Sequence, residues 1–370
     1  MAQVVCEAPV SMSRADVATA TGLTRATVSS LVDQLVAGGL LLEGAPIATA
    51  RAGRPSVPLT TAPRSVVGLG LEVNVAYLGA TLLDLTGEVI DERMVWDTFR
   101  SSNPAQVLAR VGALGTELLE EARRSGMRVA GASLALPGLV DVRTGRLQVA
   151  PNLGWQGLDP VPLLGLGHLP VRVANEAKLA AMAEPATQVP SSFLFATADV
   201  GIGAALVVDR NLFLGNHGWN GELGHILIDP DGPPCACGNR GCLEQYAGRE
   251  ALMTAAGLPI DSRLPALLAA LRANDGAATA AVGRAARALG SALADFVNLT
   301  DVSAVVLGGI FGSLFEWLHD DVLAVLNRRV LSAAFAEVTL VPASAGRTAA
   351  MVGGAREVLG DVLANPAAWI

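Results

Sequence analysis

The chain is poor in lysine, cysteine and histidine. Its 370 residues include one lysine, Lys178, although lysine and arginine together number 26, and they include four residues each of cysteine and histidine. Coding bias in a GC-rich genome explains the excess of arginine. The formal net charge of −8 argues against a protein coated in nucleic acid, but it leaves room for a small DNA-reading module.

Long hydrophobic runs and targeting signals are also missing. Although 51% of the residues are hydrophobic, no run approaches the roughly 18 apolar residues that a membrane span needs. The N-terminus has no basic stretch leading into an apolar segment, so we expect no secretory signal and no membrane partner. The few cysteines fit a reducing cytoplasm, which is the expected location. The length allows two or three domains, each with its own core.

Three of the four cysteines stand in one turn-rich segment, residues 221–244. Cys235, Cys237 and Cys242 have C-x-C-x4-C spacing, and His225 lies ten residues upstream of the first. One imidazole and three thiolates form the four-coordinate set that Zn²⁺ prefers. Two alternatives stay open. The cysteines could be incidental, or two could form a disulfide, which a chain without signs of secretion does not favour.

Residues 13–39 have the pattern of two short helices joined by a turn. Ser13 and Thr24 stand at N-cap positions, Gly22-Leu23 forms the turn, and the second segment has apolar residues at helical spacing. This pattern is typical of a helix-turn-helix. Four side chains near the start of the second helix are positioned to meet bases or phosphates, namely Arg25, Thr27, Ser29 and Ser30.

A β-wing is predicted after the two helices. Leu40-Leu41-Leu42 precedes a loop with Arg51 and Arg54, whose guanidinium groups would enter the minor groove or contact the DNA backbone. A generic helical hairpin is the alternative. Residues 1–62 carry four arginines and four carboxylates, so this neutral module would bind DNA weakly and with marked salt sensitivity. A helix normally precedes such a pair, and only residues 1–10 are available for it. We expect a start codon upstream of Met1 rather than a lost helix.

Beyond residue 60, strand-like and helix-like stretches alternate. Residues 60–64 are predicted to form a linker. Strands are expected at 65–71, 76–83, 88–95, 129–136, 193–198, 202–208, 304–307 and 338–341. Helices are expected at 104–125, 244–256, 277–298 and 345–363. The pattern predicts a DNA-binding domain at 1–60 and two α/β lobes with a cleft between them, formed by 65–175 with 345–363 and by 176–344.

Five motifs follow one another over roughly residues 65–360. They are Leu136-Pro137-Gly138-Leu139-Val140-Asp141, Pro151-Asn152-Leu153-Gly154-Trp155, Asn175-Glu176-Ala177, Gly221-Glu222-Leu223-Gly224-His225 and the cysteine cluster. In this order they resemble the ROK family, which contains sugar kinases and sugar-responsive repressors. The resemblance implies a two-lobed, actin-like ATPase (ribonuclease H-like) α/β fold. A small winged helix-turn-helix domain in front is the mark of the repressor branch.

The resemblance also implies a sugar site, lined by Asn175, Glu176, Glu222, His225 and Glu244. Amides and carboxylates suit this role, because each sugar hydroxyl both donates and accepts hydrogen bonds. If one ring nitrogen of His225 binds zinc, the other is free for a sugar hydroxyl, and the metal loop then holds Glu222 and Glu244 in place. Solvated surface positions are the alternative for these carboxylates.

The residues implied for ATP and catalysis depart from the kinases of the family. Those kinases place an aspartate as general base where this chain has Glu176, and a displacement of about an ångström can cost about 10²-fold in rate. Residues 72–76 replace the phosphate loop D-x-G-G-T, and Asp199-Val200-Gly201 replaces G-T-G. Backbone N–H groups then cannot close around a phosphate. Only Gly308-Gly309, of the adenine pocket, remains, so we expect no kinase activity.

The sequence thus predicts a sugar-responsive repressor of carbohydrate genes with Zn²⁺ as a structural cofactor. Its expected partners are operator DNA, a sugar or sugar phosphate, and further copies of the chain in a homodimer or higher oligomer, because one helix-turn-helix reads only a half-site. Two alternatives remain. Sugar-dependent ADP release would reveal an ATP-dependent sugar kinase, and the nucleotides upstream of Met1 would reveal a sugar-binding protein whose DNA module no longer works.

Overall fold

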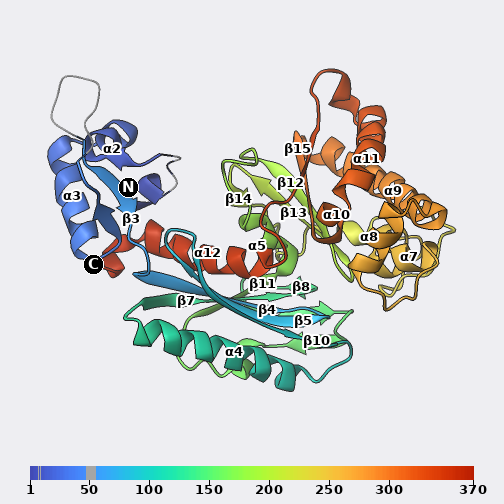
Figure 1. The fold of residues 1–370 in the computed structure, drawn as a ribbon, viewed down its shortest axis with the longest axis horizontal. Helices are drawn as coiled ribbons and strands as arrows, with labels where there is room; N and C mark the ends of the chain where they lie inside the picture. Colours follow the sequence, from blue (N-terminus) through green and yellow to red (C-terminus); the bar gives the residue numbers. More distant parts are fainter. Residues whose placement is uncertain (7, 9, 47–55) are drawn as a thin grey trace.

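In the described residues, the N-terminal module contains three short helices and a three-stranded sheet (Figure 1). The structure is a computed structural model that describes residues 1–6, 8, 10–46 and 56–370. Helices α2 (Arg14–Thr21) and α3 (Arg25–Ala37) begin at the predicted N-caps, whose hydroxyl groups accept hydrogen bonds from backbone N–H groups. Between them lies Gly22 at φ 70°, a left-handed conformation that favours glycine.

The sheet of this module has the strand order β1-β3-β2, formed by β1 (Met12–Ser13), β2 (Leu41–Glu43) and β3 (Pro58–Thr61). The antiparallel strands β2 and β3 are the flanks expected of a wing. Arg51 and Arg54 fall among residues 47–55, outside the described residues. The linker predicted at 60–64 is wrong at its start, because Thr60 and Thr61 pair with β2 and β-branched residues favour strands. α1 (Ala2–Cys6) is a short helix with two buried residues.

A five-stranded sheet follows, with the strand order β11-β7-β4-β5-β6. β4 (Val66–Val73), β5 (Tyr77–Asp84) and β6 (Val89–Trp96) form an antiparallel meander, to which β7 (Arg128–Leu136) and β11 (Val171–Asn175) add parallel strands. α4 (Pro104–Arg124) covers one face and α12 (Ala349–Ala364) the other (Figure 1). Because both faces are covered, every residue of β4 and β5 is buried.

A second five-stranded sheet has the order β14-β13-β12-β15-β16. Its strands are β12 (Phe193–Ala198), β13 (Ile202–Val208), β14 (Asn211–Leu212), β15 (Ala304–Gly308) and β16 (Thr339–Pro342). Alternate residues of β12 enter different cores. Leu194 packs with α9 (Gly276–Thr300) and α11 (Phe315–Arg329), whereas Phe193 packs with α5 (Glu176–Met182).

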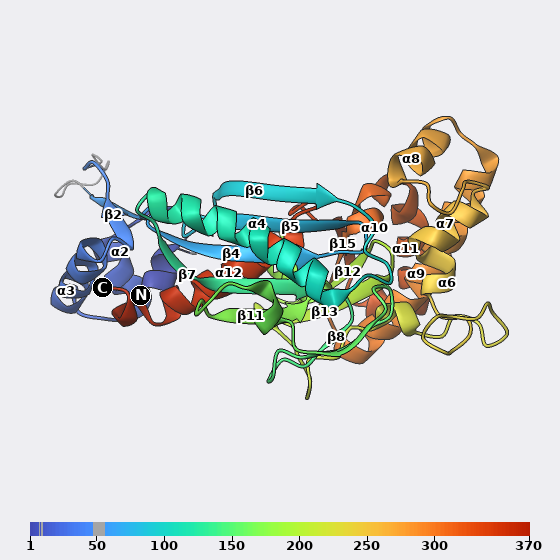
Figure 2. The same cartoon turned by 90° about the horizontal axis from the view of Figure 1, so that it is seen from below.

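Smaller elements complete the two halves. A sheet of β8 (Leu139–Val140), β9 (Leu147–Ala150) and β10 (Trp155–Leu158) lies beside the first large sheet, and α10 (Gly309–Ser313) follows β15. Helices α6 (Glu244–Ala247), α7 (Arg249–Ala255) and α8 (Leu264–Arg272) form the end of the molecule opposite the N-terminal module (Figure 2). None of the helices in the described part of the chain is long and apolar enough to cross a membrane.

The predicted fold class is confirmed, since both halves are α/β layers around a five-stranded sheet. The domain boundaries stay predictions. The single helix predicted at 244–256 is wrong, because α6 ends and α7 begins at Gly248, which has ψ 159°. A Cβ at this position would lie 2.6 Å from the carbonyl oxygen of Glu244.

Helix α12 belongs to two cores at once. Its middle packs on α5, where a Cβ added to Gly353 would lie 1.8 Å from the carbonyl oxygen of Leu179. Its C-terminal half, with Leu359 and Val362, packs into the core of the N-terminal module. Beyond it, Arg128 at the start of β7 donates hydrogen bonds to the carbonyl oxygens of Trp369, at 2.5 Å, and of Gly38 after α3, at 2.6 Å. Figure 1 accordingly shows the C-terminus beside α3.

Replacing Gly353 by Ala should destabilise the protein, because the added Cβ would overlap the backbone of α5. We expect a loss of about 1–3 kcal/mol, as in other overpacked cores. The matched control is Gly360→Ala on the same helix, where nothing lies within 4 Å and alanine should stabilise by about 0.4–1 kcal/mol. Urea unfolding measures both free energies, and equal effects would contradict the close contact of α12 with α5.

Candidate functional site

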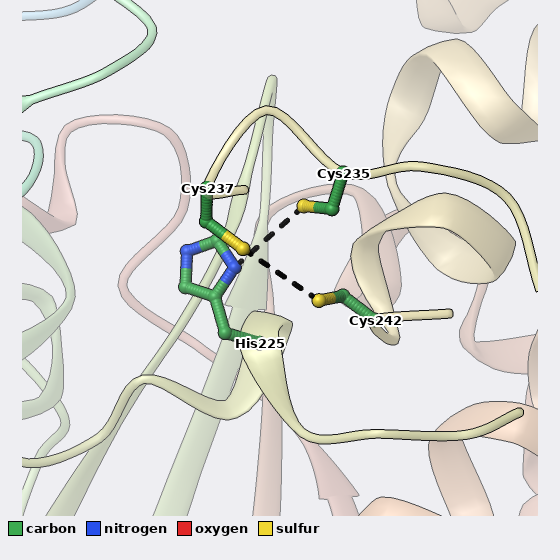
Figure 3. A group of neighbouring side chains, drawn as sticks. All are labelled: His225, Cys235, Cys237 and Cys242. Carbon is green, nitrogen blue, oxygen red and sulfur yellow. Dashed lines mark hydrogen bonds between the residues drawn. The ribbon is translucent and has the colours of Figure 1, made fainter. Parts of the chain in front are cut away.

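His225 and three cysteines converge on one point (Figure 3). Their ligand atoms all lie within 4.8 Å of one another. Cys237 Sγ is 3.7 Å from Cys242 Sγ, and Cys235 Sγ is 3.9 Å from His225 Nδ1. A tetrahedral zinc ion with Zn–S bonds of about 2.3 Å requires sulfur separations of about 3.8 Å. The four side chains therefore fit a zinc ion, and the three cysteines form no disulfide.

The loop that carries these ligands folds back on itself with the help of glycine. Gly241 has φ 64°, and a Cβ there would lie 1.6 Å from the carbonyl oxygen of Asp229. Isolated bridges pair Leu227 with Cys242 and Pro234 with Arg240. The chain thus returns to η2 (Leu223–His225), the short helix that ends in the histidine ligand.

Asn175 ends β11 and caps helix α5. Its Oδ1 accepts hydrogen bonds from the amides of Ala177 and Lys178, at 3.0 and 3.4 Å. Its Nδ2 donates to the carbonyl oxygen of Gly138 at 3.1 Å and to Glu176 Oε2 at 2.9 Å. Asn175 therefore holds the carboxyl group of Glu176 in place, and it has to release an internal bond before it can bind a sugar directly.

Glu176 lies among other charged groups. Its pKa is raised to about 8, chiefly by desolvation and also by the carboxylates of Glu72 and Glu222, while Lys178 opposes the shift. Burial also raises the pKa of Glu72, to about 7. Lys178 is only 2% exposed, its Nζ donates to the carbonyl oxygen of Asn220 at 2.8 Å, and burial lowers its pKa. The single lysine of the chain is thus buried between two predicted sugar ligands, Glu176 and Glu222.

Glu222 and Glu244 stand near the metal ligands. Burial raises the pKa of both carboxyl groups, and His225 opposes the shift in each. Glu244 Oε2 accepts a hydrogen bond from the amide of Ile202 at 3.2 Å. A pocket of about 110 Å³ opens beside Glu244, lined by Arg100, Asn152, Val200, Ala236, Glu244, Gln245, Gly248, Glu250 and Ala251.

Asn152 is a candidate that sequence reasoning missed. Its side chain lines this pocket. A Cβ added to Gly201 would lie 3.0 Å from Asn152 Nδ2 and 2.7 Å from Glu244 Oε2, so the two side chains approach the same point. The sequence offered one sign of this residue, because Asn152 belongs to the motif Pro151-Asn152-Leu153-Gly154-Trp155, which resembles the family. The resemblance alone did not assign Asn152 to the sugar site. Asn152 comes from the first half of the molecule and Glu244 from the second, so a ligand between them would touch both.

A direct hydrogen bond joins the two turns that replace the phosphate loops. Asn74 Nδ2, after β4, donates to Asp199 Oδ2, after β12, at 3.0 Å. Nearby, Tyr77 donates its hydroxyl hydrogen to Glu72 Oε1 at 2.7 Å, whereas Glu72 Oε2 is buried without a hydrogen-bond partner. Where the resemblance implies two glycines and a threonine, the chain has Asn74, Val75 and Ala76, and Asp199 stands where it implies a glycine.

The predicted DNA contacts lie along the start of α3. Arg25, Thr27 and Ser30 are exposed and Ser29 is half-buried. The hydroxyl of Thr27 is hydrogen-bonded to that of Thr24 at 2.9 Å, so it also takes part in the helix cap. Arg14 forms ion pairs with Asp33 at 2.6 Å and with Glu43 at 2.8 Å. Arg14 therefore holds α2 against α3 and β2, and the roles of the exposed residues stay predictions.

Known proteins resemble this chain over most of its length. A model of the ROK family matches residues 68–359. The xylose repressor of Caldicellulosiruptor bescii is 27% identical over 381 residues, which cover 96% of this chain and 93% of the relative. The crystal structure of a ROK family transcriptional regulator, a homolog of the E. coli MLC protein, has a TM-score of 0.80 at 26% identity, covering 98% of this chain and 94% of that one.

Kinases are related as well. A ROK family glucokinase from Streptomyces griseus, in complex with glucose and AMPPNP, has a TM-score of 0.69 at 25% identity and covers 79% of this chain and 98% of its own. The fold and the ligand cluster thus place the molecule in the two-lobed, actin-like α/β class. The chain belongs to the ROK family, whose model matches well over half of its residues. Because the relatives include repressors and kinases, membership alone does not decide the activity.

Replacing Glu176 by Gln should stabilise the protein increasingly as the pH rises. The folded state keeps a proton on Glu176 up to about pH 8, whereas the unfolded chain loses it near pH 4.3. Folding therefore becomes less favourable as the pH rises between these values. Glutamine imitates the protonated acid, so the gain in melting temperature over the native chain should grow from pH 5 to pH 8.5.

The exposed Glu120 on α4 provides the control, since Glu120→Gln makes the same chemical change on the surface. For this variant, the difference in melting temperature from the native chain should stay constant from pH 5 to pH 8.5. A gain for Glu176→Gln that is constant across the pH range would contradict the raised pKa.

Proposed function

We propose that the protein is a sugar-responsive transcriptional repressor that binds operator DNA through its N-terminal module and a sugar between its two halves. The extent of the similarities carries this proposal. The regulator structure covers 98% of the chain and therefore includes the N-terminal module, whereas the glucokinase covers 79%. The helices α2 and α3 with strands β2 and β3 follow the order of a winged helix-turn-helix.

The state of the catalytic end supports a repressor without kinase activity. A general base must be ionised to accept a proton, but the pKa of Glu176 is raised to about 8. The hydrogen bond between Asn74 and Asp199 joins the turns that would have to surround the phosphates.

Zinc would act as a structural cofactor held by His225, Cys235, Cys237 and Cys242. The ion would fix the imidazole ring through Nδ1, the nitrogen nearest to Cys235. Figure 3 shows the second ring nitrogen on the side away from Cys235 and Cys242. That nitrogen would donate a hydrogen bond to a sugar hydroxyl, while the loop holds Glu222 and Glu244 beside it. The sugar ligands proposed are Asn175, Glu176, Glu222, His225 and Glu244, with Asn152 added.

Helix α12 would carry the sugar signal to the DNA-binding module. A sugar that binds Asn175 and Glu176 touches the first residues of α5, and α5 packs on the middle of α12. The C-terminal half of α12 lies in the core of the module. A change in the closure of the two halves would therefore reorient the modules. In a homodimer this changes the spacing of two recognition helices that must lie about 34–36 Å apart.

Removing one cysteine ligand should remove the metal and weaken sugar binding. We expect the purified native chain to contain about one zinc per chain, measured by inductively coupled plasma mass spectrometry, and Cys242→Ser to contain much less. Its melting temperature should fall, because the loop loses its cross-link. Cys6→Ser, which lies outside the cluster, is the matched control. Equal metal content in the two variants would contradict the zinc site.

Sugar should weaken operator binding by about 5- to 150-fold, the range of a typical coupling free energy. DNA ligands selected by the protein itself from a random pool would supply the operator for fluorescence anisotropy. Arg25→Ala should lose DNA binding and keep sugar binding, whereas Glu222→Gln should lose the sugar response and keep DNA binding. Operator affinity that no sugar changes would contradict the proposal. Sugar-dependent ADP release from ATP would favour the kinase instead.

A further inference from the structure

The proposed sugar site is lined by carboxyl groups from both halves of the molecule. Glu72 lies near the end of β4 and Glu176 begins α5. In the second half, Asp199 and Glu222 lie in loops and Glu244 begins α6. They form one electrostatic group, since Asp199 acts on Glu72, Glu72 and Glu222 act on Glu176, and Glu244 acts on Glu222.

Three of the four cations around this group interact with other groups of the protein. Lys178 is buried and donates to the carbonyl oxygen of Asn220 at 2.8 Å. Arg100 forms an ion pair with Glu250 at 2.6 Å. Arg347, which acts on Tyr77, lies over the ring of Trp96, 5.2 Å from its centroid. His225 offers Nδ1 to the cysteine cluster. Of these four, only Arg347 is an exposed cation without an ion pair among the described residues.

Backbone donors in the two turns are also used within the protein. The amide of Asn74 donates to the carbonyl oxygen of Tyr77, and that of Ala76 donates to Asn74 Oδ1. In the other turn, the amide of Asp199 donates to the carbonyl oxygen of Gly201, and that of Ile202 to Glu244. A phosphate needs several N–H or cationic donors, and these four amides are not available for one.

We propose that the effector is an uncharged, unphosphorylated sugar, and that the carboxyl groups of the site reject phosphate esters of the same sugar. This inference rests on the proposed function, because it names the class of ligand for that site. Carboxylates accept hydrogen bonds from neutral hydroxyls, but they repel a phosphate that has no cation to compensate it. The protons held by Glu72 and Glu176 reduce the negative charge near neutral pH, yet they add no positive charge.

Isothermal titration calorimetry on the full-length, zinc-loaded protein tests this inference with matched pairs of ligands at pH 7.5. The pairs are glucose and glucose 6-phosphate, N-acetylglucosamine and its 6-phosphate, and xylose and its 5-phosphate. For the pair whose parent sugar binds most tightly, the ester should bind at least about tenfold more weakly, because it brings like charges together.

Two variants refine the result. Asp199→Asn removes one negative charge near the phosphate region and should narrow the ratio between parent sugar and ester. Glu120→Gln removes one negative charge from the exposed face of α4 and should leave the ratio as it is. The ratio compares the affinities of one protein for the parent sugar and for its ester. A variant that is merely less stable loses affinity for both ligands alike, so its ratio stays the same.

Three outcomes decide between the ideas. A parent sugar that binds at least about tenfold more tightly than its ester supports the inference. An ester that binds as tightly as its parent, or more tightly, overturns this inference and leaves the proposed function standing, and Arg347→Ala then shows whether that guanidinium binds the phosphate. If neither form of any sugar binds, the proposed function fails and the inference fails with it.

Discussion

The close approach of α12 to its neighbours is the constraint on which the rest of the structure depends. A Cβ added to Gly70 on β4 would lie 1.9 Å from the carbonyl oxygen of Met351, and one added to Gly68 would lie 2.5 Å from that of Ala355. Gly353 brings α12 equally close to α5. Since the far half of α12 completes the core of the N-terminal module, the proposed sugar ligands at the start of α5 and the proposed DNA-binding helices pack against the same helix.

The two ends of the proposed sugar site offer a ligand different groups. At one end, four ligands have the separations of a tetrahedral zinc site. At the other end, Asn74 donates a hydrogen bond to Asp199, and a buried carboxyl oxygen of Glu72 has no hydrogen-bond partner. A kinase needs both ends, because it must hold a sugar and a polyphosphate together. A sugar sensor needs only the first end, so the proposed repressor does not require a phosphate site at the second.

Local patterns predicted much of this structure, and contacts distant in sequence account for what they missed. Strands β12 and β13 have the predicted bounds because their runs of apolar residues fill both faces of a covered sheet. The break at Gly248 was missed because it depends on one close contact with Glu244. The ligand cluster was predicted from spacing alone. The place of Asn152 beside Glu244 was not predicted, because only the fold brings the two residues together. The hydrogen bond between Asn74 and Asp199 was missed for the same reason, since 125 residues separate them in the sequence.

The low affinity expected of each copy of the proposed DNA-binding module would let a small change at the proposed sugar site control it. Among the described residues of the module, Arg14 is held in ion pairs and Arg25 is exposed. Few phosphate contacts give low affinity per copy, so occupancy of an operator would require two modules at the correct spacing. A coupling of about 1–3 kcal/mol is then enough to change occupancy. Because α12 links the modules to α5 through packed backbone, a small rotation of one half against the other can supply it.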